Sequence, residues 1–255
     1  MNMLVLLKQT LDTEEKIVIE QGQIKDEGLN FIINPYDEYA VEEAIKLKEE
    51  FGGEVTVITV GPSRVESALR TALAMGADKG ILVDDETLFG DEYTLSKVLS
   101  AVVKDRSFDI ILTGNMSVDN GAGQVGIRLA EELGISPLSS ITQMTIEGEK
   151  ATVVRDVEGD AEIIETSLPL LITAQQGLNE PRYPSLPGIM KAKKKPIERV
   201  SADDLGISPA EVQAKSMVID QYLPKAKNAG RVLSGNLADQ AKELVQLLHQ
   251  EAKVI

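Results

Sequence analysis

The chain has 255 residues, of which 43% are hydrophobic and 4% aromatic, and it contains no cysteine and no tryptophan. The missing cysteines exclude disulfides, thiolate metal sites and a cysteine nucleophile, and the single histidine, His249, makes a Ser-His-Asp triad or a multi-histidine metal site implausible. The net charge of −15 disfavours binding to nucleic acid or anionic lipid, except where basic residues gather at 191–199.

The sequence carries no recognisable targeting or membrane signal. No basic segment precedes a long apolar run at the N-terminus, so no signal peptide is predicted. No stretch of about 18 apolar residues is present, so no membrane span is predicted either. We therefore expect a cytoplasmic protein, with a core of small aliphatic residues that suits parallel strands under helices.

Apolar runs alternate with amphipathic stretches through the first half of the chain. A small hairpin is expected around Gln21 and Gly22. Buried strands are predicted at residues 3–7, 54–60, 79–83 and 109–113, and the four helices that follow them end near residues 52, 76, 104 and 134. This alternation is typical of a parallel sheet covered by helices, with right-handed crossovers.

Two helix starts have recognisable capping residues. Asn34 is expected to cap the first helix, with Pro35 at its first position and Asp37 in its positive first turn. Ser63, with Glu66 three residues later, fits a capping box at the start of the second helix.

The pattern changes in the second half of the chain. Short alternating runs at 142–146, 151–155 and 161–166 predict an antiparallel meander, and residues 168–174 predict a further buried strand. Residues 214–236 show no period and are expected to form an extended arm before a last helix at 236–253. The fold class is thus a three-layer Rossmann-like α/β domain, residues 1–200, with an antiparallel addition, followed by a C-terminal arm and helix at 201–255.

Residues 178–196, here called the docking segment, combine four prolines and a glycine with apolar residues and lysines. The prolines argue against a regular helix or central strand through most of the segment. A shaped loop with an apolar anchor and a basic flank suits docking to an acidic protein surface, and Leu186 between Pro184 and Pro187 would be a preorganised plug. The alternatives are a solvated loop or a weak nucleic-acid patch, and the overall charge and the lack of interleaved aromatics oppose the latter.

Three strand-to-helix connections are candidates for a ligand site at the carboxyl edge of the sheet. They are residues 34–37, residues 60–63 and residues 114–126, and the last is called here the glycine-rich segment. The glycine-rich segment is longer than an ordinary connection, and its glycines would let backbone amides approach an anion at the next helix N-terminus. The alternative is an ordinary turn in which glycines only allow close packing.

Other chemical motifs are weaker. Residues 121–126 read G-x-G-x-x-G, but they follow the fourth strand, and position 143 is Gln where an NAD site needs an acid, so we reject a standard NAD fold. The carboxylate clusters at 42–43, 84–86 and 131–132 are interpreted as solvated faces, and His249 as a surface residue. Lys8, at the mouth of the first strand, could meet a phosphate or pair with a carboxylate. No nucleophile with its base is found, so hard chemistry would need an imported cofactor.

Three strings carry a resemblance to a known family. They are NPYDEYAVEEA at 34–44, RTALAMGAD at 70–78, and LNEPRY at 178–183 followed by LPGIMKAKKK at 186–195. The last is the most specific, and the match covers nearly the whole chain. The chain resembles the β subunits of electron transfer flavoproteins.

The resemblance implies that the fold is of the adenine-nucleotide-binding type, and it also implies a partner, cofactors and site residues. The chain would pair with an α subunit that binds most of the redox FAD at the interface, and would itself hold AMP. It would carry electrons from flavin dehydrogenases, such as acyl-CoA dehydrogenase in fatty acid oxidation, to a downstream oxidoreductase, with no catalytic residue of its own. Residues implied to touch the nucleotide are Leu6, Asn34, Pro35, Tyr36, Asp37, Val60, Gly114, Asn115, Met116, Ser117, Val118, Asp119, Asn120, Gly121, Ala122, Gly123, Gln124 and Val125. Residues implied to dock the dehydrogenase are Tyr183, Leu186, Pro187, Ile189, Met190 and Lys191.

Two alternatives stay open. One is an electron-bifurcating β subunit that binds a second FAD and oxidises NADH; the glycine-rich segment lacks the threonine-bearing Asp-Gly-Asp-Thr-type stretch typical of those members, which favours the AMP type. The other is a free-standing ATP- or AMP-binding sensor of the same fold.

Overall fold

The computed structural model describes residues 1–227 and 229–255. These residues form two compact units. The larger comprises Met1–Ile17 and Lys25–Ile219, and the smaller comprises Val18–Ile24 and Asp220–Ile255. Each unit is described by itself.

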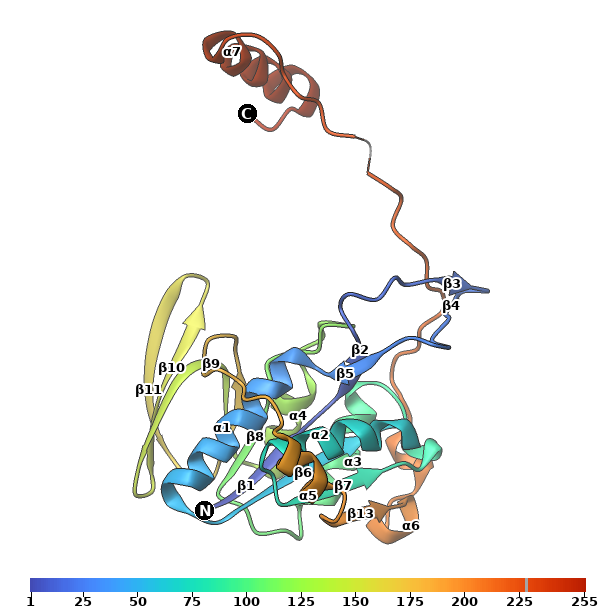
Figure 1. Ribbon diagram of the computed structural model, residues 1–255, viewed down its shortest axis with the longest axis vertical. Helices are drawn as coiled ribbons and strands as arrows, with labels where there is room; N and C mark the ends of the chain where they lie inside the picture. The colour runs from blue at the N-terminus through green and yellow to red at the C-terminus, as the bar shows by residue number, and fades with distance from the viewer. Residues whose placement is uncertain (228) are drawn as a thin grey trace. The chain divides into compact units, whose positions relative to one another are not determined.

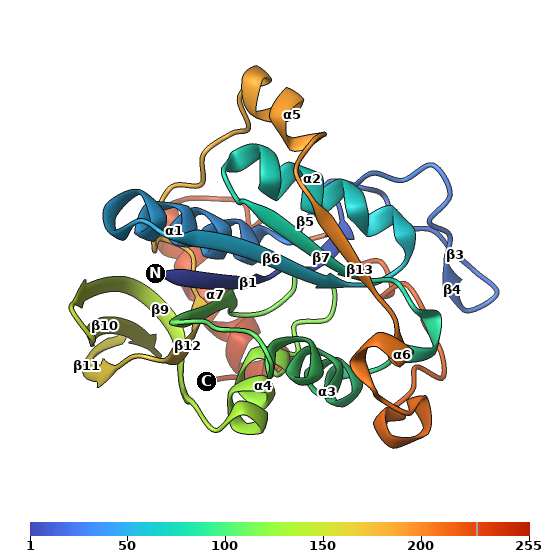
Figure 2. The ribbon, with the colours of Figure 1, turned by 90° about the horizontal axis from the view of Figure 1, so that it is seen from below.

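The larger unit is built on a nine-stranded sheet in the order β11-β10-β9-β12-β8-β1-β6-β7-β13 (Figures 1 and 2). From β9 to β13 every neighbouring pair is parallel, and β9, β10 and β11 form an antiparallel meander at one edge. The strands are β1 (Asn2–Leu6), β6 (Glu54–Val60), β7 (Lys79–Val83), β8 (Ile110–Gly114), β9 (Ser136–Glu147), β10 (Lys150–Val157), β11 (Asp160–Ser167), β12 (Leu170–Ala174) and β13 (Ile197–Val200). The expected Rossmann-like α/β class is confirmed.

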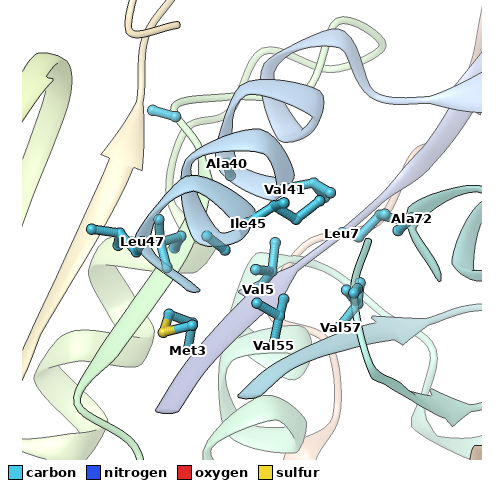
Figure 3. Packing of buried hydrophobic residues seen from close by; sticks show 14 of the residues in the cluster. Met3, Val5, Leu7, Ala40, Val41, Ile45, Leu47, Val55, Val57 and Ala72 are labelled. Atoms are coloured by element: carbon cyan, nitrogen blue, oxygen red, sulfur yellow. The ribbon is translucent and has the colours of Figure 1, made fainter. Parts of the chain in front are cut away.

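Helices cover both faces of this sheet because successive strand residues point to opposite sides. In β1, Met3 and Val5 belong to one apolar cluster, while Leu4 and Leu6 belong to another. The first cluster packs under α1 (Pro35–Phe51) and α2 (Glu66–Met75), and the second under α3 (Glu92–Val103) and α4 (Val125–Leu133). Figure 2 shows the two helix layers, and Figure 3 shows β1 and β6 side chains packed beneath α1.

Shorter elements complete the larger unit. They are β2 (Gln9–Leu11), β5 (Phe31–Ile33), α5 (Leu186–Ala192), α6 (Ala202–Leu205) and three 3₁₀ turns, η1 (Ser63–Val65), η2 (Glu86–Leu88) and η3 (Pro209–Val212). Strands β2 and β5 pair antiparallel outside the main sheet. Ala202 and Val212 join the second apolar cluster.

Both predicted helix caps need correction. Asn34 occupies the N-cap position of α1, but its side chain makes no capping hydrogen bond. Ser63 begins η1 ahead of α2, and its hydroxyl donates to Asp84 Oδ2 over 3.2 Å. Glu66 instead accepts from Arg70 and pairs with Arg199, so no capping box forms. In both cases a long-range partner outcompetes the local cap.

The docking segment is more regular than expected, because it contains α5. Ser185 Oγ caps this helix by accepting from the Gly188 amide over 3.1 Å, and Pro187 lies in the first turn, where a missing N–H costs nothing. Gly188 allows close contact with α2: a Cβ there would lie 2.4 Å from the Ala74 carbonyl oxygen. The strand β13, which follows the lysine run, was not predicted.

The smaller unit contains the predicted hairpin and the predicted last helix. Strands β3 (Ile19–Glu20) and β4 (Gln23–Ile24) pair antiparallel around Gln21 and Gly22, which have φ of 54° and 75°. Helix α7 (Leu237–Leu247) is capped by Asn236 and continues as a π-helical turn, η4 (Leu248–Ala252). The predicted arm, 214–236, holds no helix or strand among its described residues, and its Asn228 lies outside them.

Across the described ranges, no helix combines the length and apolar character needed to cross a bilayer.

Candidate functional site

The strand order reverses between β1 and β8. From β1 the chain proceeds to β6 and β7 on one side, and then returns to β8 on the other. Open α/β sheets bind ligands beyond the carboxyl ends of the strands at such a switch point. A pocket that is open to solvent lies at this point.

Thirteen of the residues predicted to touch a nucleotide line this pocket. They are Leu6, Asn34, Asp37, Val60, Gly114, Asn115, Met116, Ser117, Asn120, Ala122, Gly123, Gln124 and Val125. Pro35, Tyr36, Val118, Asp119 and Gly121 are near it in sequence but do not line it. The pocket therefore brings together parts of residues 34–37 and 114–126, whereas only Val60 of residues 60–63 lines it.

Other lining residues were missed or left undecided from the sequence. They are Leu7, Lys8, Ile58, Thr59, Glu92, Leu95, Leu99, Thr113, Gly126 and Thr173. Leu95 and Leu99 are one turn apart on α3 and form an apolar wall with Leu6 and Val60. Their i, i+4 spacing was visible in the sequence, but it is equally typical of an ordinary core-facing helix.

Asn34 fixes the path of the glycine-rich segment. Its side-chain Nδ2 donates to the Met116 carbonyl over 2.9 Å, and its Oδ1 accepts from the Val118 amide over 3.1 Å. These two bonds use the side chain that was expected to cap α1. Asn34 thus orders the segment across more than 80 residues of chain.

Lys8 pairs with a carboxylate, which is one of the two roles considered for it. Its Nζ lies 2.7 Å from Asp119 and donates to Ser117 Oγ over 3.2 Å. Burial raises the pKa of the Asp119 carboxyl, but hydrogen bonds from Lys8 and Ser117 outweigh that effect and lower it overall. The ammonium group is therefore largely neutralised at the pocket.

The N-terminus of α4 is the part of the pocket best suited to an anion. The Gln124 side chain accepts from Arg128 instead of capping the helix, so no side chain caps the first turn. Gly123 has φ of 61°, in the left-handed region that favours glycine. Gly126 brings α4 close to β8, because a Cβ there would lie 2.7 Å from Thr113 Cγ2. Backbone amides and the helix dipole favour a phosphate at this end.

Asp37 lies at the back of the pocket. Its Oδ2 accepts from the Lys8 amide over 2.7 Å, and its Oδ1 accepts from the Gly114 amide over 2.9 Å. Burial raises the pKa of this carboxyl to about 7, although the hydrogen bonds to it act in the opposite direction.

The docking segment is tied to α1 at its first end. Arg182 contacts Glu42 through Nε over 2.9 Å and Glu49 through Nη1 over 2.6 Å. Asn179 Nδ2 donates to Glu43 and to the Tyr39 carbonyl, both over 2.9 Å. Hydrogen bonds to Glu49 and Glu42 raise the pKa of the Arg182 guanidinium above its usual range.

The carboxylates at 42–43 are not a solvated face, so that interpretation is wrong. Glu42 and Glu43 are each 5% exposed, because the docking segment covers them. The predicted exposed character holds for Glu131 and Glu132. Sequence alone could not separate these pairs, since the covering residues come more than 130 positions later.

The second end of the docking segment is tied to α2. Lys195 Nζ donates to the Leu73 and Ala77 carbonyls, and Arg70 Nη1 donates to the Ala192 and Lys195 carbonyls. Burial lowers the pKa of Lys195. Arg199, at the end of the basic run, pairs with Asp84 and Glu66. The basic region at 191–199 therefore presents fewer unpaired cations to solvent than the sequence indicated, because Lys195 and Arg199 have partners within the chain. The exposed lysines within it are Lys191, Lys193 and Lys194.

Between these ties the segment presents apolar side chains to solvent. Tyr183 is 96% exposed, Leu186 80% and Met190 72%. Pro187, Ile189 and Lys191 are exposed as well, so the six predicted docking residues share an accessible surface.

Comparison with known proteins agrees with this geometry. The family model described as "Electron transfer flavoprotein domain" matches residues 21–205. The chain belongs to the electron transfer flavoprotein family. The electron transfer flavoprotein subunit beta of Bacillus subtilis (strain 168) is 57% identical over the full length of both chains. The resemblance drawn from the sequence is thereby confirmed.

More distant relatives cover most of the chain as well. The electron transfer flavoprotein subunit beta of Mus musculus is 36% identical over 89% of this chain and 90% of its own. The "Caffeyl-CoA reductase-Etf complex subunit CarD" of Acetobacterium woodii is 36% identical over 98% of this chain and 99% of its own. The matched family region includes the glycine-rich segment and the docking segment of this electron transfer flavoprotein chain.

Proposed function

We propose that this chain is the β subunit of a heterodimeric electron transfer flavoprotein that holds AMP and docks flavin dehydrogenases. In this role it carries electrons from a donor such as an acyl-CoA dehydrogenase to a downstream oxidoreductase, in cytoplasmic fatty acid oxidation. The observation that carries the proposal is the full-length 57% identity to a β subunit, combined with a pocket at the switch point. Nothing in the role requires an acid, base or nucleophile from this chain.

The pocket fits an adenylate from two sides. Leu6, Val60, Leu95 and Leu99 provide apolar surface for a flat base. The uncapped α4 N-terminus provides backbone amides for a phosphate. Because Lys8 is already paired with Asp119, these amides would hold the phosphate without a free lysine. A ligand with a flat aromatic base at one end and a phosphate at the other suits this division, and AMP has that form.

The smaller unit supports a role in subunit association. Helix α7 has no buried residues, and its Leu237, Leu244 and Val245 are 82%, 48% and 55% exposed. An amphipathic helix whose apolar side is uncovered within its own unit suits packing against a partner chain. The partner that covers α7 would be the α subunit, which would hold most of the FAD at the interface between the two subunits. FAD would supply the redox chemistry, and this chain would provide docking and one wall of the site.

The second candidate is a β subunit of a larger reductase complex that binds a second FAD. The relative named as a subunit of the caffeyl-CoA reductase-Etf complex favours it. The pocket opening into solvent does not by itself restrict the ligand to AMP.

One experiment separates these functions. The chain is co-expressed with its candidate α subunit, the complex is purified and denatured, and the released nucleotides are identified by mass. One AMP and one FAD per heterodimer are expected. Two FAD would favour the second candidate, and a stable, colourless, ATP-responsive monomer that does not associate with α would favour a sensor and overturn both.

A further inference from the structure

The nucleotide pocket contains one buried carboxylate that faces backbone rather than solvent. We propose that Asp37 is a positioning residue that ties the end of β1 to the end of β8 at the switch point, and that protonation of its carboxyl loosens the nucleotide pocket. This proposal rests on the proposed binding of AMP in the same pocket. It assigns Asp37 a role other than direct contact with the nucleotide.

The geometry places Asp37 across the point where two strands separate. Strands β1 and β8 pair with each other as far as Val5 and Leu112. Beyond that register β1 stays paired only with β6, and β8 only with β12. One Asp37 oxygen then holds the Lys8 amide, and the other holds the Gly114 amide. The carboxylate therefore replaces the ladder between strands that no longer pair with each other.

Both tied residues lead directly into the pocket wall. Lys8 continues through its side chain to Ser117 and Asp119, and Gly114 begins the glycine-rich segment. A Cβ at position 114 would lie 2.3 Å from Asp37 Oδ1, so this close approach requires glycine. A change at Asp37 therefore reaches two walls of the pocket at once.

Protonation changes what this carboxyl can accept. An ionised carboxylate accepts at both oxygens, whereas the protonated form turns one oxygen into a donor. A donor facing the Lys8 or Gly114 amide leaves that amide without its partner, and an unpaired buried group is costly. The tie then holds only one strand end.

The charged groups around Asp37 are few. Lys8 favours the ionised form, as do the hydrogen bonds that the carboxylate accepts from the Asn34 side chain and from the Lys8 and Gly114 amides. The other charged groups at the site are Asp119, which pairs with Lys8, and Glu92, which lines the pocket. Glu38, the next residue on α1, has a pKa that burial raises. Burial of Asp37 itself dominates and raises its pKa to about 7, so both forms are populated near neutral pH.

The test measures the free chain and its AMP affinity separately. In the ¹⁵N-labelled full-length chain without nucleotide, the amide resonances of Lys8 and Gly114 should titrate with a midpoint near pH 7. In Asp37→Asn they should not titrate in that range. Asp105→Asn makes the same charge change at an exposed position outside the pocket and should leave the wild-type titration intact.

AMP affinity is then measured by calorimetry at pH 6, 7 and 8. Asp37→Asn mimics the protonated tie, so its dissociation constant at pH 8 should be about tenfold higher than that of wild type. The AMP phosphate also titrates near pH 6. The variant shares that effect, so the pH-dependence seen only in wild type belongs to Asp37. Wild type should lose most of its tenfold advantage at pH 6.

Each result decides a separate question. Amides that do not titrate in wild type overturn the tie, and this measurement holds even if Asp37→Asn fails to fold. Identical pH profiles of AMP affinity in wild type and Asp37→Asn overturn its effect on the pocket. No AMP binding by wild type at any pH overturns the proposed ligand and the effect on its affinity, while the two amides still decide the tie itself.

Discussion

The glycine-rich segment and the docking segment are both tied to α1, the first at its N-terminus and the second along its later turns. Asn34 and Asp37 bond to backbone groups of the pocket, and Glu42 and Glu49 hold Arg182 of the docking segment. The two regions divide their groups in opposite ways. The pocket turns apolar walls and free amides inward. The docking segment instead turns Asn179, Arg182 and Lys195 inward and leaves apolar side chains and three lysines in solvent. One helix thus supports both the wall of the pocket and the base of the exposed docking segment.

The largest expected effect comes from Arg182→Ala, which should destabilise the docking segment and leave the pocket unchanged. Removing the guanidinium leaves Glu42 buried without its partner, and breaking such a pair costs about 3–5 kcal/mol. Because Arg182 is half-buried at one edge of the pair, we expect the lower end of that range. Urea unfolding measures the loss. AMP content of the folded fraction should stay unchanged.

Lys79→Ala is the matched control for Arg182→Ala. Lys79 pairs with Glu54 on the surface, where a pair contributes about 0–1 kcal/mol. Equal losses in the two variants would contradict the view that Arg182 anchors the docking segment.

Gly114→Ala should have the next largest effect, on the pocket only. The new Cβ would lie 2.3 Å from Asp37 Oδ1 and 2.7 Å from Tyr36 Cβ, and such overpacking costs about 1–3 kcal/mol. Bound AMP after purification should fall strongly, while the rate of reduction by the dehydrogenase per folded complex should change little. Gly230→Ala, with nothing within 4 Å of its Cβ, is the control. Unchanged AMP content in Gly114→Ala would refute the proposed path of the nucleotide.

Leu186→Ala should act on docking only. Leu186 is 80% exposed, so its truncation should barely alter stability. Loss of an anchor at an interface costs about 2 kcal/mol, or roughly 30-fold in affinity for the dehydrogenase. Reduction of the complex by the dehydrogenase is the measurement, with flavin content as the internal control. Lost flavin at an unchanged docking affinity would make Leu186 a structural residue.

The smallest effect concerns the pH-dependence of stability. The pKa of Asp37 is raised in the folded chain to about 7 from 3.8, so its contribution is complete below pH 4 and is lost as the pH rises through 7. Relative to Asp37→Asn, wild type should lose about 1 kcal/mol between pH 6 and pH 8. Thermal unfolding of both proteins at these pH values gives the difference, in which all other titrating groups cancel. A wild-type stability that rises with pH relative to that of Asp37→Asn would contradict the raised pKa.

The sequence predicted the parallel sheet well because each of its signals is local. Alternating apolar runs, glycine stops and the long connection after β8 all lie within a few residues of the element that they define. Residues 60–63 and 114–126 lie at the same edge because they follow the carboxyl ends of β6 and β8, the two strands that flank β1. Residues 34–37 follow β5, outside the main sheet, and reach that edge at the start of α1.

What the sequence did not predict depends on partners far along the chain. Lys8 had two possible roles until Asp119, 111 positions later, was placed beside it. Glu42 and Glu43 resembled a solvated pair because the residues that cover them, Asn179 and Arg182, lie in another segment. The short helix α5 escaped detection because Pro184, before the helix, and Pro187, within it, are read as breakers, although Pro187 lies in the first turn, where proline is tolerated.

The close packing of Gly188 against α2 limits which parts of the docking segment can change during evolution. There is no room for a methyl group between α2 and α5 at Gly188. A shift of α5 against α2 would therefore also break the hydrogen bonds that Arg70 and Lys195 donate to backbone carbonyls. The tip has no such restriction, since Leu186 and Met190 touch mainly water. If this segment docks electron donors as we propose, affinity for a new donor can therefore be acquired by exchanging exposed side chains one at a time on a base that stays the same.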